Sequence, residues 1–136
     1  MSLFLRKQLN PNDYSPLALA YLGDCVYDLF VRARLLEEGN RLVTQLHTEA
    51  VGSVNAKAQS EAAHFIEDML TENEVRVLKW GRNAKSNTTP KHASVTDYRW
   101  ATGLETLIGY LYMDNQIERL CEILEAAYKI RRDDTK

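Results

Sequence analysis

The stretch AYLGDCVYDLFV, Ala20 to Val31, places one carboxylate, Asp24, inside a run that otherwise has the composition of a buried helix. Ser15, which precedes a proline, is a good N-cap, and Gly39 is a plausible stop, so the pattern predicts a helix over 16–38. Apolar side chains surround most of its circumference, as in a helix buried between other helices or at a subunit interface. A buried charge costs several kcal/mol unless it is paired, so Asp24 needs a partner.

The rest of the chain has helical patterning nearly throughout and no alternation long enough to indicate a strand. Residues 71–74, TENE, form a capping box, which predicts a helix that ends near Lys85. Residues 86–95 have the Ser, Thr, Asn and Pro content of a loop. The other predicted helices cover 45–51, 54–70 with Ser53 as its cap, 97–113 with Thr96 as its cap, and 116–130. With 136 residues and 45% apolar content, we expect one all-α domain over 1–136.

Charge is distributed unevenly along the chain. The formal net charge of −2 excludes the overall basic signature of a passive nucleic-acid coat. Residues 76–99 nevertheless contain six Lys or Arg and a single acid, Asp97, which leaves a local excess of positive charge. Such a segment indicates contact with a polyanion, although a solvated helix face and its loop would have the same composition.

The cysteines and histidines indicate neither a disulfide framework nor a zinc site. Cys25 and Cys121 lie in apolar helical contexts without metal-binding spacing, so we expect buried thiols in a reducing compartment. The three histidines are dispersed. No transmembrane run or secretory leader is recognisable, so the expected location is the cytoplasm.

A second carboxylate, Glu105, lies in the apolar run TGLETLIGYLY and poses the same problem as Asp24. Small residues near it, among them Gly109, would let another helix pass closely. Two acids in apolar helices far apart in the sequence suggest one shared site. If they converge, one pKa should rise unless a cation lies between them, and Mg2+ suits a site with few carboxylates. The alternative is that each acid is hydrogen-bonded to a nearby ring, such as Tyr21, Tyr27, Tyr110 or Trp100.

At these residues the sequence resembles the ribonuclease III family. The stretch YLGDCV, residues 21–26, is similar to the helix on which that family carries a catalytic Asp, and ETLIG, residues 105–109, is similar to its second motif. GRNAKS, residues 81–86, and TTPK, residues 88–91, resemble the Mini-ribonuclease III branch, which is the catalytic domain without a double-stranded-RNA-binding domain. The resemblance covers about residues 14–128 and implies a dimeric helical bundle of the ribonuclease III endonuclease-domain type.

The resemblance implies a Mg2+-dependent endoribonuclease that cleaves double-stranded RNA, leaves 5′-phosphate ends and acts in maturation of the large-subunit precursor of ribosomal RNA. Asp24 and Glu105 carry over as catalytic metal ligands. Two further acids of the wider family are replaced, by Ala20 and Thr102, as in the Mini branch. A homodimer with the first helix at its interface would cut both strands. The residues expected to contact RNA are Arg82, Asn83, Lys85, Ser86, Thr88 and Lys91.

Two other functions stay open at the level of sequence. The chain could be a duplex-RNA-binding or scaffold dimer with a degenerate site, in line with the missing acids, or a plain helical dimer whose acids are satisfied internally. Asp28 either orients metal-bound water or lies at the interface rim. Asn55, Lys57 and Gln59 could face RNA or simply solvent.

Overall fold

A computed structural model describes residues 3–85 and 94–134 of the chain. Within these residues every regular element is helical, so the expected all-α class is confirmed there. The α-helices are α1 (Pro16–Glu37), α2 (Val43–Val54), α3 (Ala56–Ile66), α4 (Glu72–Arg82), α5 (Val95–Met113) and α6 (Ile117–Asp134), and the 3-10 turns are η1 (Pro11–Asp13) and η2 (Glu67–Met69).

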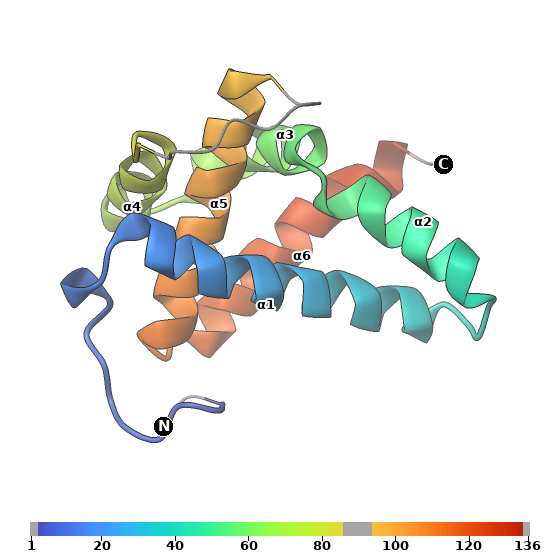
Figure 1. Ribbon diagram of the computed structural model, residues 1–136, viewed down its shortest axis with the longest axis horizontal. Coiled ribbons are helices and arrows are strands. Elements are labelled where there is room, and N and C mark those ends of the chain that lie inside the picture. The colour runs from blue at the N-terminus through green and yellow to red at the C-terminus, as the bar shows by residue number, and fades with distance from the viewer. Residues whose placement is uncertain (1–2, 86–93, 135–136) are drawn as a thin grey trace.

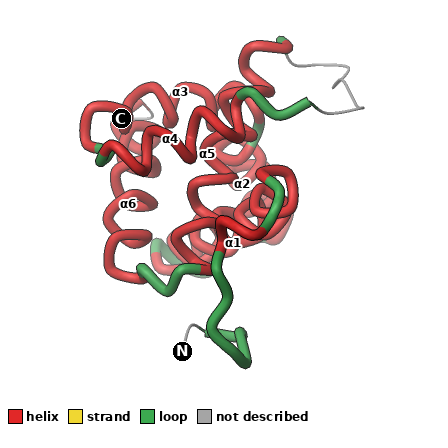
Figure 2. Tube along the Cα trace, turned by 90° about the vertical axis from the view of Figure 1, so that its left-hand side faces the viewer, coloured by secondary structure: helices red, strands yellow, loops and turns green. Residues whose placement is uncertain are grey.

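Helix α5 is the centre of the bundle (Figure 1). It crosses α1 steeply and contacts α1, α3, α4 and α6. From Ala101 to Met113 every residue is buried except Glu105, which is half-buried. Leu19 and Tyr27 of α1 and Ile123 of α6 pack into the same core cluster. The segment before α1 extends away from the helices, as the rotated view also shows (Figure 2).

The helix termini follow the local signals, with two exceptions. The Ser15 hydroxyl accepts a hydrogen bond from the Ala18 amide at 3.1 Å, as predicted for the cap of α1. The predicted cap Ser53 is wrong, because this residue is buried inside α2 and the Asn55 side chain caps α3 instead. The predicted cap Thr96 is also wrong, since Ser94 caps α5 two residues earlier. At both places two good cap residues lie close together, and sequence alone does not choose between them.

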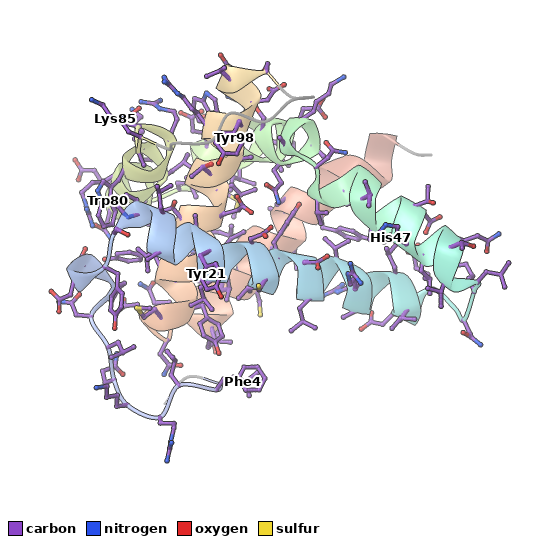
Figure 3. All side chains as sticks on the ribbon, viewed as in Figure 1. Phe4, Tyr21, His47, Trp80, Lys85 and Tyr98 are labelled. Carbon is purple, nitrogen blue, oxygen red and sulfur yellow. The ribbon has the colours of Figure 1, made fainter. Side chains whose placement is uncertain are left out.

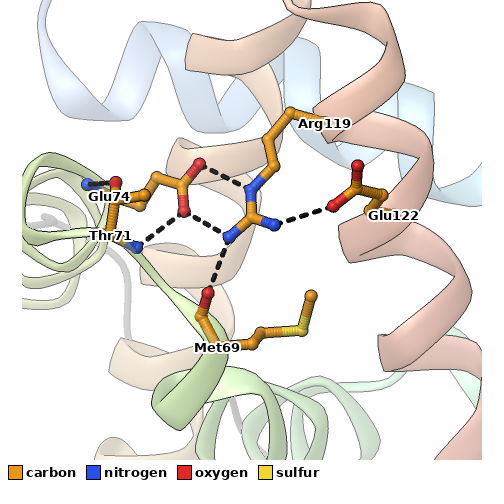
Figure 4. Close-up of polar contacts among 5 residues, drawn as sticks. All are labelled: Met69, Thr71, Glu74, Arg119 and Glu122. Carbon is orange, nitrogen blue, oxygen red and sulfur yellow. Dashed lines mark hydrogen bonds and ion pairs between the residues drawn. The ribbon is translucent and has the colours of Figure 1, made fainter.

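The predicted capping box at the start of α4 is confirmed, and it holds a buried ion pair (Figure 4). Glu74 accepts from the backbone amide of Thr71 at 2.9 Å, and its two carboxylate oxygens accept from the Arg119 guanidinium at 2.9 and 2.8 Å. Arg119 also donates to the Met69 carbonyl at 2.7 Å. The hydrogen bond from Arg119 holds the pKa of Glu74 below its usual range. Helix α6 is thereby anchored over the start of α4.

The cysteine environments differ from the expectation. Cys25 and Cys121 are both exposed, so the prediction of buried thiols is wrong. Each lies on the outer side of its helix, because the core-facing positions of α1 and α6 are taken by other residues, such as Leu19 and Ile123. None of the helices in the described part of the chain is long and apolar enough to cross a membrane.

Candidate active site

The backbones of α1 and α5 touch where they cross. A Cβ atom on Gly23 would overlap the carbonyl oxygen of Glu105, and one on Gly109 would overlap the carbonyl oxygen of Leu19. No other residue type fits at either position without a shift, because any side chain would meet backbone rather than a flexible atom. The small residues around Glu105 led us to expect that another helix passes close to it. The structure confirms this, and the helix is α1.

This crossing brings together the two acids singled out in the sequence. Asp24 follows Gly23 on α1, and its carboxylate lies within hydrogen-bonding reach of the Glu105 side chain. Burial raises the pKa of Glu105 to about 9, with further contributions from the hydrogen bond and the negative charge of Asp24. Asp24 itself is exposed, so the expectation that it is buried is wrong.

The Asp24 and Glu105 pair fits a hard divalent cation. It offers carboxylate oxygens to one small region, where burial first and the neighbouring Asp24 second raise the pKa of Glu105, and a cation there would offset both effects. Over the described residues no group of three or more His, Cys, Asp or Glu side chains could hold a metal. A cation here would therefore keep several water ligands and have positions left for phosphate oxygens, as Mg2+ does.

The two positions that lack an acid relative to the wider motifs supply no carboxylate to this site. Ala20 is buried in the α1 interface with the core. The Thr102 hydroxyl donates a hydrogen bond to the Tyr98 carbonyl of its own helix at 2.9 Å. Asp28, one turn beyond Asp24, accepts a hydrogen bond from Arg32 at 2.9 Å, so its charge is paired along the surface of α1.

The basic segment, residues 76–99, begins within α4 and ends within α5. Arg82 is half-buried, and its Cζ lies 5.1 Å from the centroid of the Trp100 ring. Its Nε donates to the side-chain oxygen of Asn83 at 3.0 Å. Lys85 follows the end of α4, is exposed, and lies above that helix in the view of Figure 3. The other predicted RNA contacts, Ser86, Thr88 and Lys91, lie outside the described residues.

Not every cation of this segment is free for a ligand, and one predicted surface residue is buried. Arg76 donates to the side-chain oxygens of Asn73 and Asn12, at 2.9 and 3.1 Å, and so ties α4 to the N-terminal segment. Gln59 is 2% exposed, so it faces neither RNA nor solvent from α3, whereas Asn55 and Lys57 are exposed. Sequence reasoning also missed the contact of Arg82 with Trp100, since the two residues are 18 positions apart and no local pattern joins them.

The chain is similar in sequence to proteins of one known family. A family model described as the ribonuclease III domain matches residues 17–116. A Mini-ribonuclease 3 from Thermoanaerobacter sp. is 48% identical over 116 residues, which is 85% of this chain and 82% of the relative. Another from Symbiobacterium thermophilum is 49% identical over 118 residues, 87% of this chain and 91% of the relative.

A solved structure also has the same fold as this chain. The crystal structure of a protein from Fusobacterium nucleatum superposes with a TM-score of 0.80 at 32% sequence identity, covering 92% of this chain and 99% of that one. The matched fold and the sequence identity over most of the chain lead to one conclusion. The chain belongs to the ribonuclease III family, among relatives named Mini-ribonuclease 3.

Proposed function

We propose that this chain is a Mg2+-dependent endoribonuclease that cleaves double-stranded RNA as a homodimer. The endoribonuclease class follows from its family, and the metal, the duplex substrate and the assembly are the proposed steps beyond it. One observation supports the proposal above all others. Asp24 and Glu105 are 81 positions apart in the sequence, yet their side chains meet where α1 and α5 cross. At this crossing the two helix backbones are so close that not even a Cβ atom fits between them.

The two carboxylates would hold the metal. Bound Mg2+ lowers the pKa of a water molecule and offsets the negative charge that develops on a phosphate during hydrolysis. Asp24 and Glu105 supply oxygen ligands, and the contact between their helices keeps both in place. Because the pKa of Glu105 is about 9 without a cation, its carboxyl has to release a proton when it binds metal. The expected products carry 5′-phosphate and 3′-hydroxyl ends.

The end of α4 would bind the duplex. Double-stranded RNA is recognised mainly through its shape, its phosphates and its 2′-hydroxyls, for which Arg, Lys, Asn, Ser and Thr side chains are suitable donors. Arg82, Asn83 and Lys85 are the described members of the proposed contact set, and Ser86, Thr88 and Lys91 complete it in sequence. Because these contacts are largely to phosphates, affinity should fall as salt rises.

The outward face of α1 supports the proposed homodimer. Large apolar side chains recur along it at helical spacing, and Tyr21, Leu29 and Leu36 are 81%, 62% and 57% exposed. Asp24 and Cys25 lie on the same outer surface. A two-fold interface would bury this one patch on both chains and place the two sites in one assembly. Light scattering should then give twice the chain mass, and Tyr21→Glu should give a monomer.

Incubation with a long RNA duplex tests the activity. Wild-type protein should cut it with Mg2+ and not with a chelator, and Asp24→Asn or Glu105→Gln should remain folded but inactive. Asp28→Asn is the matched control, because it removes a carboxylate one turn along the same helix whose partner is Arg32. Cleavage by Asp24→Asn would refute the proposed site. Wild-type protein that binds duplex without cutting it would instead support the scaffold alternative, which the missing acids at Ala20 and Thr102 keep open.

The cellular substrate is a further part of the proposal. We infer from the family resemblance that the enzyme acts in the cytoplasm on the precursor of large-subunit ribosomal RNA. Cells that lack the protein should then accumulate large-subunit RNA with unprocessed ends, which primer extension detects. Normal ends in such cells would exclude this substrate without bearing on cleavage of duplex RNA in vitro.

A further inference from the structure

Trp100 connects three helices near the start of α5. The ring of His64, on α3, lies with its centroid 4.0 Å from that of Trp100 and its plane tilted by 40°. The guanidinium carbon of Arg82, the last residue of α4, lies 5.1 Å from the same Trp100 ring centroid. An arginine within about 6 Å of an indole ring is attracted to it, and tryptophan is the strongest partner for such contacts.

Two glycines fix where Arg82 lies relative to Trp100. A Cβ on Gly103, one turn along α5 from Trp100, would come within 2.6 Å of the Leu78 carbonyl oxygen and 3.3 Å of the Arg82 backbone nitrogen. A Cβ on Gly81 would overlap the hydroxyl of Thr106. The last turn of α4 therefore lies directly against α5. The position of the Arg82 backbone follows from this contact rather than from the loop beyond it.

The same helix carries the candidate catalytic site. Trp100 and Glu105 are five residues apart, which corresponds to about 7.5 Å along the helix axis and a turn of about 140° around it, so their side chains leave α5 on different sides. The Thr106 hydroxyl, whose nearer acceptor is the Thr102 carbonyl at 2.7 Å, also lies 3.1 Å from the carbonyl oxygen of Pro16 at the start of α1. The end of α4 and the start of α1, the helix that carries Asp24, are thus both packed against α5. Arg82 therefore keeps a fixed position relative to the helices that carry Asp24 and Glu105.

Arg82 keeps its charge available. Four other arginines are neutralised by acids, in the pairs Arg32 with Asp28, Arg34 with Glu125, Arg41 with Glu49 and Arg119 with Glu74. Among the side chains the structure describes, no carboxylate lies within ion-pair distance of Arg82, whose polar partner is the neutral Asn83. A guanidinium that is held by a ring and an amide, without an acid, is ordered and still able to bind an anion.

We propose that Trp100 is a positioning residue for RNA, whose ring holds the Arg82 guanidinium in place to contact a backbone phosphate of the duplex being cut. The inference rests on the proposed function, since it assigns part of the RNA contact. Arginine suits the role better than lysine, because a planar guanidinium stacks on a ring and donates in a fixed fork, whereas an ammonium has no plane to stack and no fork. His64 packs against the same ring and supports it from α3.

The test is a double-mutant cycle on cleavage of a long RNA duplex with Mg2+. Trp100→Leu should raise KM about threefold and leave kcat unchanged, since the ring contributes to binding and not to the chemistry. Trp100→Phe, which keeps an aromatic face, should restore most of the affinity. In an Arg82→Ala background Trp100→Leu should have no further effect, whereas in a Lys79→Ala background it should still raise KM about threefold.

A second variant keeps the inference testable if Trp100→Leu fails to fold by circular dichroism. Arg82→Lys leaves Trp100 untouched and retains the charge, yet it should raise KM about threefold because the ring contact is lost. Wild-type KM for Arg82→Lys, or an equal effect of Trp100→Leu with and without Arg82, would overturn the role of Trp100. Absence of any cleavage by the wild-type protein would instead overturn the proposed function, so the two failures are distinguishable.

Discussion

The α-carbon of Gly23 lies so close to the backbone of Glu105 that a Cβ atom there would overlap the glutamate carbonyl oxygen. This contact joins the two longest stretches of apolar sequence, and it also brings Asp24 to the side chain of Glu105. Packing of the core and assembly of the candidate site therefore depend on the same few atoms. A change that separates α1 from α5 should affect both.

Gly23→Ala tests this dependence. The added methyl group has to push two helix backbones apart, so we expect the free energy of unfolding to fall by about 2 kcal/mol or more. Cleavage should fall more than stability explains, because Asp24 moves away from Glu105. Urea unfolding and cleavage at saturating duplex measure the two effects. Ala33→Gly, on the exposed face of α1, is the control, costing about 1 kcal/mol through helix propensity with wild-type cleavage. Wild-type stability for Gly23→Ala would contradict the close crossing.

The protonation of Glu105 predicts a pH dependence of stability without metal. Its pKa is about 9 in the folded protein and 4.5 for the ordinary side chain, so between these values the unfolded state releases a proton that the folded state retains. The stabilisation is complete below the lower value and is lost as pH rises toward the higher one. Urea unfolding with a chelator should show this decline in wild-type protein and not in Glu105→Gln. Equal slopes for the two proteins would contradict it. Mg2+ should flatten the wild-type curve, because metal binding favours the deprotonated acid.

The sequence predicts those features of the fold and the site that depend on contacts between residues close together in the chain. The all-α class and the capping box at Thr71 follow from spacing and local hydrogen bonds, and the structure agrees. Spacing also singled out Asp24 and Glu105, although it placed Asp24 in the core. Helical periodicity shows which residues share a face, but it does not show whether another helix covers that face. The exposure of Asp24 and Cys25 was missed for this reason.

Contacts between distant segments were beyond prediction from one sequence. Nothing near Arg82 indicates that a tryptophan from the next helix lies over it, and nothing near Gln59 indicates burial in an alanine-rich helix. Glu74 was expected to cap α4, and its second partner, Arg119 on α6, appears only in the folded chain. These contacts decide which polar residues are available to a ligand.

Arg119→Met should destabilise the fold strongly. Glu74 is 5% exposed, so removal of the arginine leaves a buried carboxylate with Thr71 as its remaining partner, at an expected cost of about 3 kcal/mol in urea unfolding. Because the pKa of Glu74 is lowered in the folded protein, its stabilisation is present at neutral pH and is lost as pH falls through that pKa. Arg32→Met, which removes the exposed pair with Asp28, should cost less than about 0.5 kcal/mol. Similar costs for the two variants would contradict a structural role for the buried pair.

Lys85→Ala separates RNA binding from metal binding. Lys85 is exposed and lies two residues beyond the C-cap of α4, far along the chain from both acids. If it contacts one phosphate, the slope of log affinity against log salt should become shallower by about 0.9, measured in an Asp24→Asn background that binds duplex without cutting it. Calorimetric titration of Lys85→Ala with Mg2+ should match wild-type protein, since neither carboxylate is changed. Lys129→Ala, which removes an exposed lysine on α6 outside the proposed contact set, is the control and should keep the wild-type slope. If Lys85→Ala keeps the wild-type slope as well, the phosphate contact does not involve this residue.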